Sequence, residues 1–228
     1  MIEFLFLDMD DTILDFHKAE RIAVSKTFAS LGLEPTQEVV DRYHVVNQLH
    51  WQMLERGELT REQVVVQRFA ALFDELGVDI DAVKCMETYE NLLCVGHYFM
   101  PGAEEALKAL SSKYRLFLAS NGTAKVQASR IKSANLAPWF EQIFVSQDIG
   151  ANKPSPLYYE RCFARIPGFE VSRAMMVGDS LTSDMRGGLN MGMHTCWVNP
   201  EHRPRNPEIP VEYEIAGLGE LPTLLDTL

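Results

Sequence analysis

Five aspartates stand directly after, or close behind, two short apolar runs of the chain: Asp8, Asp10, Asp11, Asp179 and Asp184. Carboxylates that gather at one site repel one another unless a proton or a cation balances their charge. Hard oxygen ligands of this kind favour Mg²⁺, and beside a cation one carboxylate can stay ionised and act as a nucleophile. The aspartates therefore predict a cation-assisted reaction at a carboxylate cluster.

A hydroxyl and an ammonium group follow two further apolar runs. Ser120 comes at the end of Arg115–Ala119, and Lys153 follows the run Gln142–Ser146 after a short connection. Both groups can hold phosphoryl oxygens and stabilise charge that develops on them. Together with the aspartates, they indicate phosphoryl chemistry.

These side chains need a common edge, and the apolar runs provide one. The runs are continuous rather than alternating, as in strands that are buried on both faces of a parallel sheet. They alternate with helical patterns, which predicts a doubly wound α/β domain whose ligands gather at the carboxyl ends of the strands. The expected strands cover 2–7, 115–119, 142–146, 173–177 and 195–199, and the expected helices cover 103–113, 124–135, 156–165 and 183–191.

Residues 16–97 interrupt this rhythm with helical patterns alone. The expected helices cover 18–31, 37–55, 61–76 and 80–97, with Thr60 and Gln63 forming a capping box at the start of the third and Gly77 ending it. The sequence therefore predicts a discontinuous α/β core domain, 1–15 and 98–228, with a four-helix domain, 16–97, inserted after the first strand.

Four short motifs, in this order, resemble those of the haloacid-dehalogenase-like (HAD) phosphohydrolases across nearly the whole chain. Asp8-Met-Asp-Asp-Thr12 resembles the family's first motif, Ser120 the second, Lys153 the third, and Gly178-Asp-Ser-Leu-Thr-Ser-Asp184 the fourth. The helical insert resembles the family's cap domain. One departure is Asp11, where many family members have glycine; we expect its side chain to point away from the phosphate and to cap the following helix or turn.

The resemblance implies a role for each motif residue. Asp8 attacks phosphorus and forms an aspartyl-phosphate, and Asp10 acts as general acid and then as general base. Mg²⁺ is held by Asp8, by Asp10 through its backbone carbonyl, by Asp179, and by Asp184 through a water molecule. Thr12, Ser120, Asn121 and Lys153 serve the phosphate, Thr12 by orienting the first loop. An acid at position 10 favours phosphate esters over carbon–halogen bonds, because an alkoxide leaving group needs a proton.

Softer signals resemble the capped 5′-nucleotidases that act on pyrimidine nucleoside monophosphates. They include Val46-Asn47 with Trp51, and Cys196-Trp-Val-Asn199 followed by His202-Arg203. By this resemblance Trp51 stacks on a base, and Asn47 or His50 reads its edge. Each of these three residues also fits the packing of an amphipathic helix. The alternative substrates are sugar phosphates or other small phosphometabolites.

A second class of function is a phosphoryl-accepting signalling or binding module without turnover. Such a module needs neither Asp10 nor the large insert, and Asp10 would speed the loss of its phosphate. The formal charge of −11 argues against a nucleic-acid polymer or an anionic membrane as partner. Four cysteines in 228 residues form no disulfide framework, and no signal peptide is visible, so we expect a cytoplasmic protein, monomeric or weakly dimeric.

Overall fold

The chain folds into two compact units. The computed structural model describes all residues, 1–228. Met1–Phe16 and His97–Leu228 form one unit, called the core unit below, and His17–Gly96 forms the other, called the helical unit. The chain passes between the two units twice, once on each side of the helical unit.

Six parallel strands form a single sheet in the core unit, in the order β3-β2-β1-β4-β5-β6. Their bounds are β1 Phe4–Leu7, β2 Arg115–Ser120, β3 Gln142–Val145, β4 Ala174–Gly178, β5 His194–Val198 and β6 Tyr213–Ile215. The chain builds one half of the sheet outward from β1 through β2 to β3, and then returns to the other side of β1 with β4. Ligand sites in such sheets lie at the carboxyl ends of the strands where the order reverses, here β1 and β4.

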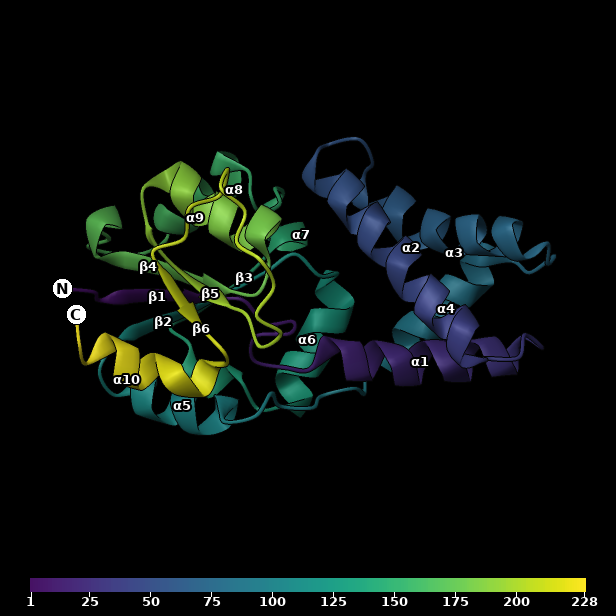
Figure 1. Cartoon of the computed structure of the whole chain (residues 1–228), viewed down its shortest axis with the longest axis horizontal. Coiled ribbons are helices and arrows are strands. Elements are labelled where there is room, and N and C mark those ends of the chain that lie inside the picture. The colour runs from purple at the N-terminus through teal and green to yellow at the C-terminus, as the bar shows by residue number, and fades with distance from the viewer. The chain divides into compact units, whose positions relative to one another are not determined.

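Helices cover both faces of the sheet (Figure 1). Leu5 and Leu7 pack into an apolar cluster with side chains of α5 and α10, whereas Phe4 and Phe6 pack with Tyr159 of α8 on the opposite face. Burial on both faces explains why the strands are apolar throughout, and the fold confirms the doubly wound parallel sheet predicted from the sequence. The helices of this unit are α5 Ala103–Ser111, α6 Ala124–Ser133, α7 Ser146–Ile149, α8 Pro156–Phe163, α9 Arg186–Met191 and α10 Leu221–Leu225.

Several short parts of the core unit differ from the sequence prediction, among them the four-residue helix α7 in the segment expected to be a connection. The helix expected at 183–191 is divided into a π-helical turn at Leu181–Met185 and α9, and the Ser180 hydroxyl caps the start of the turn by accepting from the Ser183 amide. Strand β6 and helix α10, near the end of the chain, were not predicted. They are three and five residues long, too short for a hydrophobic period to show.

The helical unit contains α1 Phe16–Ser30, which starts in the core unit, and α2 Gln37–Glu55, α3 Arg61–Leu76 and α4 Ala82–Leu93. The capping box of Thr60 and Gln63 is confirmed, and Gly77 ends α3 in the left-handed conformation. Helix α4 is shorter than expected at both ends. The Asp81 side chain accepts from the Val83 and Lys84 amides and fixes its start at Ala82, and the helix ends at Leu93 rather than at residue 97. No helix in either unit combines the length and apolar composition needed to cross a membrane.

Candidate active site

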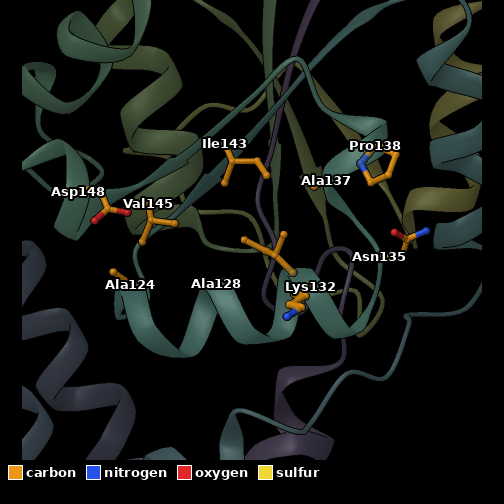
Figure 2. A pocket seen from close by; sticks show the side chains of 10 residues that line it. Ala124, Ala128, Lys132, Asn135, Ala137, Pro138, Ile143, Val145 and Asp148 are labelled. Carbon is orange, nitrogen blue, oxygen red and sulfur yellow. The ribbon is translucent and has the colours of Figure 1, made fainter.

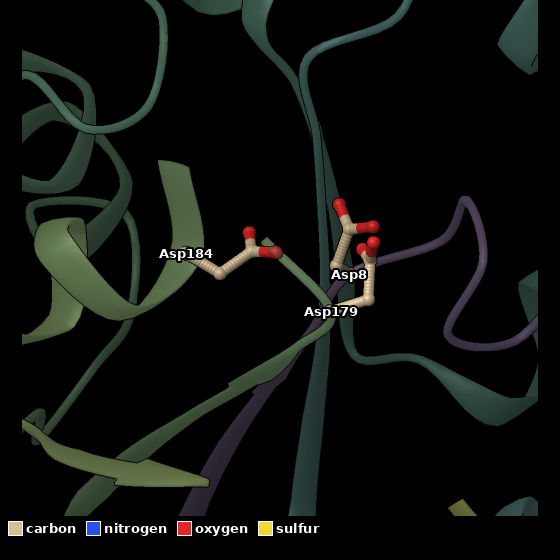
Figure 3. Close-up of side chains that lie close together, drawn as sticks. All are labelled: Asp8, Asp179 and Asp184. Carbon is tan, nitrogen blue, oxygen red and sulfur yellow. The ribbon is translucent and has the colours of Figure 1, made fainter. Parts of the chain in front are cut away.

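Three carboxylates meet at the carboxyl edge of the sheet. Asp8 follows β1, Asp179 follows β4, and Asp184 lies on the π-helical turn behind β4. One oxygen from each lies within 4.8 Å of the other two, and Figure 3 shows the three side chains converging. The structure thus brings together three of the four predicted metal ligands through their side chains.

Lys153 ties two of these carboxylates together. Its Nζ donates to Asp8 Oδ1 and to Asp184 Oδ1, each at 2.6 Å, and to the Ala119 carbonyl at 2.7 Å. The lysine is 1% exposed, so its charge faces the carboxylates rather than water. In a buried ion pair, close geometry and additional hydrogen bonds must offset the cost of removing both charges from water.

The loop after β4 holds Asp184 from its other side. The Ser180 amide donates to Asp184 Oδ2 at 3.1 Å. Gly178 leaves room for this carboxylate, because a Cβ at Gly178 would lie 2.2 Å from the same oxygen. The glycine that ends β4 is therefore required by the position of Asp184, and not by an unusual backbone angle.

Burial and mutual repulsion set the electrostatics of the cluster. Burial raises the pKa of Asp8 well above its usual value, and Asp184 and Asp10 add to the shift against the opposing effect of Lys153. Burial also raises the pKa of Asp179, with Asp184 and Asp8 adding to it. Burial alone would lower the pKa of Lys153, but Asp184 and Asp8 outweigh it, so its pKa is raised and the ammonium stays charged.

The donor set fits a hard divalent cation. Three ionised carboxylates and one ammonium leave two formal negative charges at the cluster, and one divalent cation would balance them. All donors are oxygens, the ligand type that Mg²⁺ prefers. A cation would also oppose the raised pKa of Asp8 and Asp179, since an opposite charge favours the ionised form.

Asp10 lies against two residues of α6 that the sequence analysis missed. Gln127 Nε2 donates to Asp10 Oδ2 at 2.7 Å, and Arg130 Nη1 donates to Asp10 Oδ1. Gln127 also donates to Ser120 Oγ at 2.7 Å. Long polar residues on a helix usually indicate a solvated face, and no local pattern distinguishes these two.

Thr12 and Asn121 are held differently from each other. Thr12 is fully buried, and its hydroxyl has no hydrogen-bond partner within the protein. Asn121 exchanges two hydrogen bonds with the Lys153 backbone, both at 2.9 Å, and donates to Ser183 Oγ at 3.2 Å. The Asn121 side chain thus fixes the segment that carries Lys153.

Asp11 adopts the left-handed conformation, with φ of 57°. Its Oδ1 accepts from the Phe16 amide at 2.9 Å, at the start of α1. The expectation that this side chain caps the following helix is confirmed. The backbone angle is one that glycine adopts without strain and that aspartate tolerates better than most residues.

A side chain of β5 and one of the loop 199–205 hold the backbone of Asp179. Arg203 Nη2 and Trp197 Nε1 both donate to the Asp179 carbonyl, at 2.8 and 2.9 Å. The Arg203 guanidinium also lies 5.3 Å from the Trp197 ring centroid. Arg203 was named in the sequence analysis only as part of the resemblance to the 5′-nucleotidases, and its contacts place it among the supports of the site.

The three candidate specificity residues all lie on α2 of the helical unit. Asn47 is 2% exposed, and its amide is engaged at both ends, donating to Glu20 Oε1 at 2.5 Å and accepting from Arg68 Nη1 at 2.8 Å. His50 is half-buried with its Nδ1 2.7 Å from the Val46 carbonyl. Trp51 is half-buried with the Arg61 guanidinium 5.7 Å from its ring centroid.

A groove elsewhere on the core unit contains none of the predicted site residues. It lies between α6 and the edge strand β3, as Figure 2 shows, and its lining includes Ala128, Ile131, Lys132, Pro138 and Ile143. The candidate active site is therefore the carboxylate edge and not this groove.

Comparison with known proteins adds independent findings. A family model described as haloacid dehalogenase-like hydrolase matches residues 2–192. The HAD-hydrolase YfnB of Bacillus subtilis is 38% identical over 222 residues, covering 97% of this chain and 94% of the relative. Its crystal structure, bound to magnesium, superposes with a TM-score of 0.94 and covers 99% of both chains.

Two further relatives carry substrate names. The pyrimidine 5′-nucleotidase PynA of Streptococcus pneumoniae is 33% identical over 225 residues, covering 98% of this chain and 95% of the relative. The pyrimidine 5′-nucleotidase YjjG of Escherichia coli is 27% identical over 223 residues, covering 98% of this chain and 97% of the relative.

Proposed function

This chain belongs to the haloacid dehalogenase-like hydrolase family, and from that premise we propose that it is a Mg²⁺-dependent phosphomonoesterase. Its favoured substrates are pyrimidine nucleoside 5′-monophosphates. The observation that carries the proposal is the pairing of a buried nucleophile, Asp8, with a second carboxylate two residues later, Asp10, at the same sheet edge. Hydrolysis of an unactivated ester requires both, one to attack phosphorus and one to serve the leaving oxygen.

The reaction proceeds in two displacements. Asp8 attacks phosphorus, the bond from phosphorus to the leaving oxygen breaks, and Asp10 donates its proton to that oxygen. In the second step Asp10 takes a proton from water, the water oxygen attacks the aspartyl-phosphate, and the bond from phosphorus to Asp8 breaks. Inorganic phosphate leaves, and both carboxyl groups return to their starting forms.

The surrounding groups hold charge and position. Lys153, already 2.6 Å from Asp8, stabilises negative charge that develops on the phosphoryl oxygens. Ser120 and the backbone after it bind the phosphate, with Asn121 fixing the lysine segment and Thr12 the first loop. Asp8, Asp179, the Asp10 carbonyl and Asp184 would hold Mg²⁺, Asp184 through water. When bound, the ion supplies charge neutralisation that lets a dianionic ester approach the carboxylates.

The substrate class rests on the relatives and on α2. PynA and YjjG, each similar over 98% of this chain, are pyrimidine 5′-nucleotidases. We propose that Trp51 and His50 contact the nucleoside from the helical unit, which acts as a cap domain. Asn47, engaged at both ends, would influence substrate choice only through its neighbours.

A substrate panel tests this proposal directly. Purified protein with Mg²⁺ is expected to hydrolyse dUMP, dTMP and UMP with higher kcat/KM than sugar phosphates of similar size. Faster turnover of the sugar phosphates would replace the nucleotidase assignment by a sugar phosphatase. Binding of phosphate without turnover of any ester would favour a phosphoryl-accepting module.

Two manipulations test the mechanism. Asp8→Asn is expected to reduce turnover by at least about 1,000-fold with the fold retained, because the amide is a poor nucleophile. EDTA is expected to abolish turnover, and excess Mg²⁺ to restore it. Normal turnover by the variant, or activity unaffected by EDTA, would refute the corresponding step.

A further inference from the structure

Gln127 and Arg130 lie three residues apart on α6 and therefore on the same face of the helix. That face points to the active site, since both side chains contact Asp10. Gln127 is 1% exposed and Arg130 is fully buried. Two long polar side chains are thus buried against the residue that serves as acid and base in the proposed function.

The Gln127 carboxamide links three groups. Its Oε1 accepts from Arg130 Nη1 at 3.1 Å, and its Nε2 donates to Asp10 Oδ2 and to Ser120 Oγ, both at 2.7 Å. Its orientation is therefore determined at both ends. Through this one amide, α6 fixes the loop after β1, which carries Asp10, relative to the end of β2, where Ser120 lies.

The hydrogen bonds of the Ser120 hydroxyl determine whether it donates or accepts. Its oxygen accepts from Gln127 Nε2 and also from the Gly122 amide at 3.2 Å. A hydroxyl oxygen has two acceptor sites, so both are occupied and its hydrogen is free to donate. Gln127 thus makes Ser120 a donor, the role that binding a phosphoryl oxygen requires.

Arg130 holds the other carboxylate oxygen of Asp10, Oδ1. Its guanidinium pairs with Asp10 Oδ1 and lies 5.5 Å from the ring centroid of Phe16, where α1 starts. The planar fork resists rotation when it is stacked and paired in this way. Arg130 therefore restricts the Asp10 side chain more strongly than a single hydrogen bond would.

We propose that Gln127 and Arg130 are positioning residues, with Arg130 orienting Asp10 toward the leaving oxygen and Gln127 orienting both Asp10 and the Ser120 hydroxyl. The assignment rests on the proposed function, in which Asp10 is the general acid. It gives α6 a part in both halves of the site, proton transfer through Asp10 and phosphate binding through Ser120.

The dependence of kcat on the leaving group distinguishes a residue that positions Asp10 from one that only supports the fold. The sugar alkoxide of dUMP needs a proton to leave, whereas the phenolate of p-nitrophenyl phosphate leaves readily without one. General acid catalysis contributes about 100- to 10,000-fold to the rate. Arg130→Met is therefore expected to lower kcat for dUMP by about 100-fold and kcat for p-nitrophenyl phosphate by less than about fivefold, with KM little changed.

Conservative and neighbouring variants sharpen the test. Arg130→Lys keeps a cation within reach of Asp10 and is expected to recover about tenfold of the lost dUMP activity. Gln127→Met removes the donor to Ser120 as well, so it is expected also to weaken competitive inhibition by inorganic phosphate about tenfold. Gly122→Ala removes no polar group of the site but puts a Cβ 2.3 Å from Gln127 Nε2, so Gln127 must shift and the variant should reproduce the Gln127→Met pattern.

Arg115 offers a matched control in the same unit. It pairs with Glu141 and lies 5.0 Å from the Phe4 ring centroid, at the opposite end of β2 from Ser120. Arg115→Met removes the same kind of pair and is expected to leave the ratio of the two kcat values unchanged. If Arg130→Met lowered kcat equally for dUMP and p-nitrophenyl phosphate, the positioning assignment would be wrong and the proposed function would still stand. A wild-type protein that hydrolyses neither ester would overturn the proposed function, and the assignment with it.

Discussion

Gly178 shows how a single residue can set the geometry of a carboxylate cluster. It ends β4 with ordinary backbone angles, yet its missing side chain is what admits the Asp184 carboxylate. Asp184 in turn receives hydrogen bonds from Lys153 and from the Ser180 amide. At the residue scale, the site depends on space as much as on charge.

Gly178→Ala is expected to displace Asp184 and to weaken Mg²⁺ binding. The new Cβ would lie 2.2 Å from Asp184 Oδ2 and 2.8 Å from its Cβ, so the whole side chain must shift. Loss of such support around a metal site lowers affinity or activity by about 10- to 100-fold. The Mg²⁺ concentration for half-maximal activity measures the effect. Gly217→Ala, where no atom lies within 4 Å, is the control, and equal behaviour of the two variants would contradict the steric explanation.

The raised pKa of Asp179 predicts how stability depends on pH. Without a cation, this pKa makes the ionised form of Asp179 unfavourable in the folded state. A raised pKa contributes stability at low pH that is lost as the pH rises through the folded-state value. In EDTA, Asp179→Asn should therefore be more stable than the wild type near pH 7.5, and the difference should vanish toward pH 3. Thermal unfolding at several pH values measures it.

Mg²⁺ should reverse that order. A ligand at about 100 times its Kd stabilises the folded state by about 2.7 kcal/mol, or about 5–10 °C in Tm for a chain of this size. The wild type is expected to gain this shift and Asp179→Asn to lose most of it. A variant that gains as much from Mg²⁺ as the wild type would place the cation away from Asp179.

At the element scale, the sheet and its loops could be predicted because their signals are local. Continuous apolar runs indicate buried parallel strands, and the topology then brings Asp8, Asp179 and Lys153 to one edge. Gln127 and Arg130 could not be predicted in this way. Their partner Asp10 is 117 and 120 residues distant in sequence, and nothing on α6 itself distinguishes a face turned to the site from a face turned to water.

The helical unit has its own element-scale feature, a polar network that links three of its helices. Glu20 of α1, Asn47 of α2 and Arg68 of α3 are all buried and connected in that order by hydrogen bonds. Helical periodicity predicted these helices but not the network. Amphipathic patterns show which face is apolar, and they do not show which polar residues are buried together.

Arg68→Met is expected to destabilise the protein by about 3 kcal/mol, because it leaves buried polar partners without their cation. The guanidinium also lies 5.1 and 5.0 Å from the ring centroids of Phe69 and Tyr89, contacts that methionine replaces only in part. Arg21→Met breaks an ion pair with Asp41 that is half-exposed on both sides and should cost less than about 1 kcal/mol. Urea unfolding of both variants measures the difference, and similar costs would contradict a buried network.

At the scale of the whole molecule, the formal charge of −11 acts on the approach of the substrate. A nucleoside monophosphate is a dianion near neutral pH, so a protein of the same sign repels it at long range. In the proposed function, Lys153 and a bound Mg²⁺ would attract it only near the site. The Debye length falls from about 30 Å at 0.01 M salt to about 10 Å at 0.1 M, so salt screens the distant repulsion more than the close attraction.

Added KCl should therefore raise kcat/KM for dUMP, opposite to the behaviour of an enzyme that steers its substrate by attraction. Between 10 and 100 mM KCl at saturating Mg²⁺ we expect an increase of about two- to threefold. The turnover number kcat should stay constant, because encounter does not limit the rate at saturation, and it provides the internal control. A fall in kcat/KM with salt would mean that the positive charge of the loaded site, and not the net charge of the chain, governs the approach of the ester.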